Sequence, residues 1–121
     1  MIERTMHVLA VTDLDASAAF YRDVLGFTIE DIGDPGWRMF LKDSCRIMAG
    51  HCPEAIPPKD LGDHSYFAYF VVDRVDPYYD RAMRHGAEIL QVPQDKPWGM
   101  REFCLRTIDG HRIMVGQDLE G

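Results

Sequence analysis

The chain contains an internal repeat, which limits the folds that it can adopt. Residues 43–50 (DSCRIMAG) align with residues 109–116 (DGHRIMVG) at a constant offset of 66, sharing Asp, the triplet Arg-Ile-Met and the closing Gly. Upstream, residues 37–41 (WRMFL) match residues 100–104 (MREFC) at an offset of 63. A chain made of two similar halves is expected to fold as two similar structural modules.

The first half begins with a predicted strand and a predicted helix. Residues 6–11 form a short apolar run of the length expected for a buried strand. Asp13 or Asp15 is expected to cap the following helix, since a carboxylate accepts the N–H groups left free in the first helical turn. Gly26 is expected to end this helix, because glycine adopts the left-handed conformation found there.

The second half begins in the same way. Residues 66–72 predict the strand, and Asp76-Pro77 predicts the N-cap and the first residue of the helix. Gly86, which lies 60 positions after the glycine that ends the first helix, is expected to end the second.

Three further strand-like runs follow each predicted helix. They are residues 27–32, 36–42 and 45–50 in the first half, and residues 87–92, 99–106 and 111–117 in the second. Asp109-Gly110 predicts a tight hairpin, and Asp43-Ser44 is its weaker counterpart. The predicted organisation is one domain over residues 1–121, with module one at 1–50, a linker rich in proline at 51–65 and module two at 66–121.

The order and spacing of several short fragments resemble the vicinal oxygen chelate superfamily, which includes glyoxalase I, extradiol dioxygenases, fosfomycin-resistance enzymes and bleomycin-resistance proteins. The fragments include VTDLD at 11–15, LGF at 25–27, WG at 98–99 and DG at 109–110, and the resemblance covers essentially the whole chain. It implies an α+β fold in which two βαβββ modules form a curved half-barrel sheet with the helices on its convex side. It also implies dimers whose pockets are built from two chains.

Enzymes of this superfamily typically hold a divalent metal through His or Glu side chains, one from the first and one from the last strand of each module. The resemblance places these four positions at Met6, Met48, Phe67 and Met114. Thioethers and a phenyl ring do not suit the divalent ions that these enzymes use. We therefore expect no bound metal and no other cofactor.

The favoured interpretation is a metal-free, bleomycin-resistance-like protein that sequesters a planar aromatic or heterocyclic natural product or metabolite. Methionine side chains adapt their shape, and aromatic rings offer stacking surfaces. The same methionines could instead be core residues, and Arg101 would bind a carboxylate of the guest or form a surface ion pair. The predicted ligand-binding residues are Trp37, Met39, Met48, Phe67, Tyr69, Trp98, Met100, Arg101 and Met114.

Two enzymatic alternatives stay open. The first is a metal-dependent glyoxalase-like or dioxygenase-like lyase, isomerase or oxygenase whose displaced metal site uses His7, His64 or Glu102. His7 would reach the cavity only if its strand slipped by one residue, because a strand alternates its faces, and Glu102 has no partner that the sequence reveals. The second is a metal-free catalyst that orients a substrate for proton transfer.

Composition limits the possible partners. Thirteen Lys plus Arg against twenty Asp plus Glu give a net charge of -7, which opposes binding to nucleic acid. The start of the chain holds only a short apolar run, which predicts no membrane segment. Three cysteines outside any CxxC pairing favour a reducing, cytoplasmic location. We expect a small-molecule ligand and a homodimer, since a two-fold partner can cover exposed sheet edges.

Overall fold

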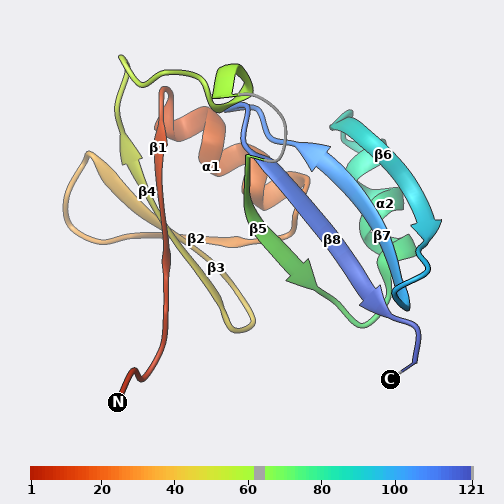
Figure 1. The fold of residues 1–121 in the computed structure, drawn as a ribbon. Helices are drawn as coiled ribbons and strands as arrows, with labels where there is room; N and C mark the ends of the chain where they lie inside the picture. Colours follow the sequence, from red (N-terminus) through yellow and green to blue (C-terminus); the bar gives the residue numbers. More distant parts are fainter. Residues whose placement is uncertain (62–64, 121) are drawn as a thin grey trace. The chain divides into compact units, whose positions relative to one another are not determined.

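The computed structural model describes residues 1–61 and 65–120, and the chain divides into two compact units, Met1–Ile56 and Pro57–Gly121 (Figure 1). Both units contain a strand, a helix and three more strands in this order. The predicted α+β class and the repeated βαβββ module are therefore confirmed. None of the described helices is long and apolar enough to cross a membrane.

The first unit is a four-stranded sheet with one helix packed on it. Its elements are β1 (His7–Val11), α1 (Leu14–Asp23), β2 (Thr28–Asp31), β3 (Trp37–Lys42) and β4 (Cys45–His51). The strand order is β1-β4-β3-β2, with β1 parallel to β4 and the other neighbours antiparallel. The helix packs against β2, β3 and β4.

The alternation of side chains along β1 shows which face of the first sheet meets the helix. Leu9 and Val11 are buried, whereas Val8 is 63% exposed. The buried face packs on α1, whose fully buried Tyr21 places its ring 4.7 Å from the ring of Phe40. The predicted register of this strand is therefore confirmed, because a slip by one residue would have buried Val8 instead.

The second unit repeats this arrangement. Its elements are the short 3-10 helix η1 (Pro58–Leu61), β5 (Tyr66–Val71), α2 (Val75–Arg84), β6 (Glu88–Asp95), β7 (Met100–Arg106) and β8 (Arg112–Asp118). The strand order is β5-β8-β7-β6, with β5 parallel to β8, and α2 packs against β6, β7 and β8. Phe103 is fully buried and lies 5.5 Å from the ring of Tyr79 on the helix.

The segment without periodicity, residues 51–65, is partly structured. His51 is still part of β4, and the N–H of Cys52 donates to the carbonyl of Val11 at 2.7 Å. Further on, η1 belongs to the second unit, where a Cβ atom at Gly110 would lie 3.2 Å from the backbone nitrogen of Lys59. Short helical turns of this kind leave no periodic pattern in the sequence.

Both helices end as predicted. Gly26 and Gly86 have φ angles of 78° and 73°, so each takes the left-handed conformation that glycine favours after a helix. Asp13 is the N-cap of α1, and its Oδ1 accepts the N–H of Ala16 at 3.0 Å. Of the two candidate caps, the structure therefore selects the first.

The predicted start of the second helix is wrong. Asp76-Pro77 does not provide the N-cap and first residue, because α2 begins at Val75 with Arg74 as its N-cap. Oε1 of Gln117, on β8, accepts the N–H of Val75 at 3.0 Å. Gln117, more than 40 positions away in the sequence, thus takes the capping role. Pro77 is still tolerated, because the N–H groups of the first helical turn have no partner within the helix.

The strand pairing corrects the alignment of the two halves of the chain in one segment. Trp37 lies opposite Gly50, and Glu102 lies opposite Gly116, so β3 and β7 correspond at an offset of 65. The match at an offset of 63, which aligned Trp37 with Met100, is therefore wrong by two residues. Short apolar strands contain too few distinctive residues to fix an alignment when the hairpin loops that follow them differ in length.

Candidate functional site

The first sheet carries apolar side chains on the face that points away from α1. Met39 lies opposite Met48, which in turn lies opposite Val8. In the adjoining row, Trp37 lies opposite Gly50, and a Cβ atom at Gly50 would come within 2.8 Å of Cη2 of the indole. The absence of a side chain at Gly50 thus allows Trp37 to lie across the sheet.

The second sheet carries a polar centre on the face that points away from α2. Oε2 of Glu102 accepts a hydrogen bond from the hydroxyl of Tyr69 at 2.7 Å and from Nε1 of Trp98 at 3.1 Å. Glu102 is only 4% exposed, whereas Tyr69 and Trp98 are 41% and 63% exposed. One buried carboxylate oxygen therefore holds two exposed aromatic side chains in place.

Tyr69 reaches Glu102 by crossing over Gly116, which lies between β5 and β7 in the sheet. A Cβ atom at Gly116 would overlap the Tyr69 hydroxyl and come within 2.6 Å of Cζ. Burial, and next the hydrogen bond to Glu102, raise the pKa of the Tyr69 hydroxyl well above its ordinary value. The phenol therefore stays protonated at neutral pH and acts as a donor to the carboxylate.

A tight turn between β6 and β7 presents Trp98. The N–H of Gly99 donates to the carbonyl of Lys96 at 3.0 Å, with Pro97 at the turn position that suits its fixed φ. Gly99 has a φ of 86°, a conformation that a residue with a side chain rarely adopts. The indole is thus attached to a backbone that is restrained on both sides.

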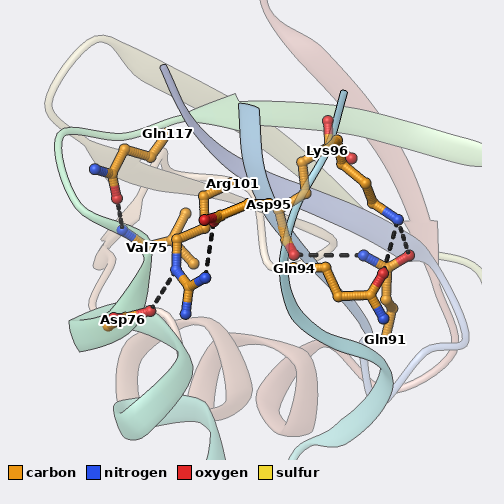
Figure 2. A network of polar contacts seen from close by, with 9 residues as sticks. Val75, Asp76, Gln91, Gln94, Asp95, Lys96, Arg101 and Gln117 are labelled. Atoms are coloured by element: carbon orange, nitrogen blue, oxygen red, sulfur yellow. Dashed lines mark hydrogen bonds and ion pairs between the residues drawn. The ribbon is translucent and has the colours of Figure 1, made fainter. Parts of the chain in front are cut away.

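Lys96 lies beside the indole. Its Nζ is 3.0 Å from Oε1 of Gln94 and 3.3 Å from Oε1 of Gln91, contacts that Figure 2 shows, and it is 5.8 Å from the centre of the Trp98 ring. Nε2 of Gln91 also approaches the backbone oxygen of Glu102 at 3.4 Å. The ammonium group of Lys96 therefore donates to two amide oxygens, which hold it beside the Trp98 indole.

The structure brings two further predicted residues to the same face of the second sheet. Met114 lies in register between Tyr69 and Cys104, and Met100 precedes Glu102 by two positions on β7. Phe67 behaves differently because the pairing of β5 with β8 is irregular at this residue. Its ring packs edge to face against that of His111, at 5.5 Å, and so does not continue the row of Tyr69.

Arg101 lies on the opposite face from Glu102. Its Nε is 3.0 Å from Asp76 in the first turn of α2, and its other contact, from a terminal guanidinium nitrogen to Asp95, measures 2.9 Å (Figure 2). Arg38 makes a similar pair of contacts in the first unit, with Asp15 and Asp31. Of the two roles predicted for Arg101, the structure shows the ion pair, and it does not bring this residue together with Trp98.

The four positions at which the resemblance implies a metal do not fit one, because they carry three thioethers and a phenyl ring at Met6, Met48, Phe67 and Met114. Over residues 1–61 and 65–120, no three His, Cys, Asp or Glu side chains gather into a group that could hold a metal ion. His7 lies on the side of β1 that Leu9 and Val11 share, and His64 lies outside the described residues.

Sequence reasoning missed the role of Glu102. Its partners come from β5 and from the turn before β7, so only the strand order of the second sheet brings the three side chains together. One signal was available, since an acidic residue directly before the apolar stretch of residues 103–105 is uncommon in a buried strand unless a partner satisfies it.

Two consecutive βαβββ units define a paired-module α+β protein. Residues 2–115 match the Glyoxalase/Bleomycin resistance protein/Dioxygenase superfamily, and the chain belongs to this family. No curated protein matches the chain.

Solved structures with the same fold include three that cover nearly all of the chain. TioX from Micromonospora sp. ML1 is 27% identical, with a TM-score of 0.74 and 95% of each chain covered. The bleomycin resistance determinant encoded on the transposon Tn5 is 24% identical, with a TM-score of 0.78 and 97% of this chain and 98% of that chain covered. The hypothetical protein SA1046 from S. aureus is 19% identical, with a TM-score of 0.78, covering 97% of this chain and 95% of that chain.

Proposed function

We propose that this protein is a metal-free binding protein that sequesters a planar aromatic or heterocyclic natural product or metabolite without transforming it. The observation that carries the proposal is the pair of exposed aromatic side chains, Trp98 and Tyr69, held by the same oxygen of buried Glu102. Rings that are fixed before binding lose little freedom when a planar guest stacks on them. Such binding would protect a cell by lowering the free concentration of the guest.

The apolar face of the first sheet supports the same function. Trp37 lies across Gly50, and Met39 and Met48 lie side by side in the adjoining row. Thioether side chains adapt to irregular aromatic surfaces, and the indole supplies a flat one. The name of the Tn5-encoded relative, a bleomycin resistance determinant, supports an antibiotic as the guest.

The test is calorimetric titration with a panel of planar heterocycles, intercalator-type antibiotics and bleomycin-like glycopeptides. Removing an indole that stacks on the guest should weaken binding about tenfold or more, since stacking adds to the apolar area that is lost. Wild type is compared with Trp98→Ala and Trp37→Ala, and with Ile108→Ala as a control for losing an exposed apolar side chain in the β7–β8 loop. If a guest binds tightly and neither tryptophan variant changes its Kd, the proposal is wrong.

The alternative function is a metal-dependent lyase, isomerase or oxygenase with a displaced site that uses His7, His64 or Glu102. In the described residues the Glu102 carboxylate is hydrogen-bonded to Tyr69 and Trp98 instead. Elemental analysis of protein purified without a histidine tag separates the two functions. One Zn, Ni, Mn or Fe per chain, lost in His7→Ala, would favour the enzyme.

We further propose that the protein is a cytoplasmic homodimer that binds a small molecule and has no nucleic-acid or membrane partner. β1 and β5 are edge strands of their sheets, and each exposes a valine, Val8 and Val71, that a second copy could cover. The described cysteines, Cys45, Cys52 and Cys104, are free thiols, as a reducing compartment favours. Sedimentation that shows a monomer at micromolar concentration, with ligand binding unchanged, would contradict the dimer.

A further inference from the structure

We propose that Glu102 selects the charge of the guest, so that the second sheet binds a planar aromatic cation that carries an N–H donor. In this arrangement the guest ring stacks on Trp98, and its N–H group donates to the Glu102 carboxylate. This inference rests on the proposed function and specifies the class of ligand.

The two hydrogen bonds described for Glu102 use only one of its carboxylate oxygens. Both of its neighbours donate to Oε2, and an indole N–H can only donate, so the carboxylate acts as an acceptor. Oε1 takes part in neither of these two bonds. Because Glu102 is only 4% exposed, a donor supplied by a ligand competes with little water for this carboxylate and gains more here than at an exposed acid.

Within the described residues of the second unit, no Lys or Arg forms an ion pair with Glu102. Arg101, its neighbour in sequence, lies on the opposite face and pairs with Asp76 and Asp95. Lys96 lies beside Trp98, and its ammonium group contacts the amide oxygens of Gln91 and Gln94. The charge of Glu102 therefore stays available to a ligand.

The two aromatic residues that donate to Glu102 also favour a cation. Tyr69 and Trp98 flank the acid and leave much of their ring surface exposed. The faces of such rings attract positive charge, and the attraction is largest for tryptophan. A guest that is both planar and cationic thus gains from stacking and from charge at one place, whereas a planar anion would be repelled by the carboxylate.

The experiment compares three tricyclic probes by calorimetry. Proflavine is cationic and carries N–H donors, phenazine is neutral, and anthracene-2-sulfonate is anionic. Glu102→Gln keeps an oxygen for Tyr69 and Trp98 but removes the charge, so the Kd of proflavine should rise about tenfold or more while that of phenazine changes less than about threefold. Asp80→Asn, an exposed position on α2, removes the same charge elsewhere and should leave both affinities unchanged.

A second variant keeps the proposal testable if Glu102→Gln fails to fold. Lys96→Met removes the nearby positive charge without touching the acid and should tighten proflavine binding about twofold to fivefold. Equal loss of proflavine and phenazine binding in Glu102→Gln, or an unchanged proflavine Kd in both variants, would overturn the role of Glu102 and leave the proposed function standing. Preferred binding of anthracene-2-sulfonate, lost in Lys96→Met, would also overturn it. If none of the three probes binds wild type, this inference fails, whereas the proposed function is judged by the wider panel of antibiotics and glycopeptides.

Discussion

Gly116→Ala tests whether the crossing of Tyr69 over the sheet is what fixes its position. The added methyl group would overlap the Tyr69 hydroxyl and lie 2.6 Å from Cζ and 2.8 Å from Cε1. The tyrosine ring must therefore move, because Gly116 is in the middle of β8 and the backbone there is paired on both sides. Moving the ring breaks its hydrogen bond to Glu102, which measures 2.7 Å.

The size of the effect follows from two opposing contributions to the free energy of unfolding. A hydrogen bond to a charged group contributes about 1.5–3 kcal/mol, and its loss leaves a buried carboxylate with one donor fewer. Alanine in a strand gains about 0.5–1 kcal/mol over glycine, because glycine loses more backbone freedom on folding. Gly116→Ala should therefore lower the free energy of unfolding by about 1–2 kcal/mol.

The assay is urea denaturation of Gly116→Ala in two backgrounds, wild type and Tyr69→Ala. Removing the tyrosine ring removes the three atoms nearest to the added methyl group, so the backbone contribution should dominate and the substitution should stabilise the protein by about 0.5–1 kcal/mol. The account thus predicts a change of sign between the two backgrounds. Destabilisation of the same size in both backgrounds would show that its cause lies outside the Tyr69 ring, contrary to this prediction.

Three further predictions concern the framework of the two units. Asp13→Ala removes the acceptor of the Ala16 N–H and should cost about 1 kcal/mol in urea denaturation, whereas Asp13→Ser should restore most of it. Gly110→Ala should cost about 1 kcal/mol or more, because φ is 94° and the new Cβ would lie 3.2 Å from Lys59 N; a neutral result would contradict this. Burial lowers the pKa of His111 below 6.5, so the unfolded chain binds the proton first and stability should fall as pH drops below about 6.5. Wild type should therefore lose more stability between pH 7.5 and 5.5 than His111→Gln, and equal losses would exclude this role.

The fold could be predicted from the sequence where local chemistry decides it. The repeat fixed the number and order of the elements, and apolar alternation placed Leu9 and Val11 of β1 against the helix. The start of α2 could not be predicted, because its capping group is Gln117 from a distant strand. How the two modules pair into a half-barrel stays a prediction from the resemblance.

The candidate site was less predictable, because its centre depends on strand pairing. Trp98 and Tyr69 were expected to line a site, but the sequence does not reveal that both donate to Glu102. Arg101 was expected to face the guest or an acid on the surface. The alternation of side chains along β7 places it on the face that packs against α2, where it pairs with Asp76. A bulge in β5, which no sequence pattern announced, changes the surroundings of Phe67.

The most direct test of the central claim is to follow the two indole N–H signals by ¹H–¹⁵N NMR while a planar heterocycle that binds is added. Trp37→Phe assigns the signals, because Trp37 and Trp98 are the only two tryptophans in the chain. The account predicts that the Trp98 indole signal shifts saturably, with the Kd found by calorimetry, and that mass spectrometry recovers the guest unchanged. Saturation with the guest that leaves both indole signals in place would contradict binding at these side chains.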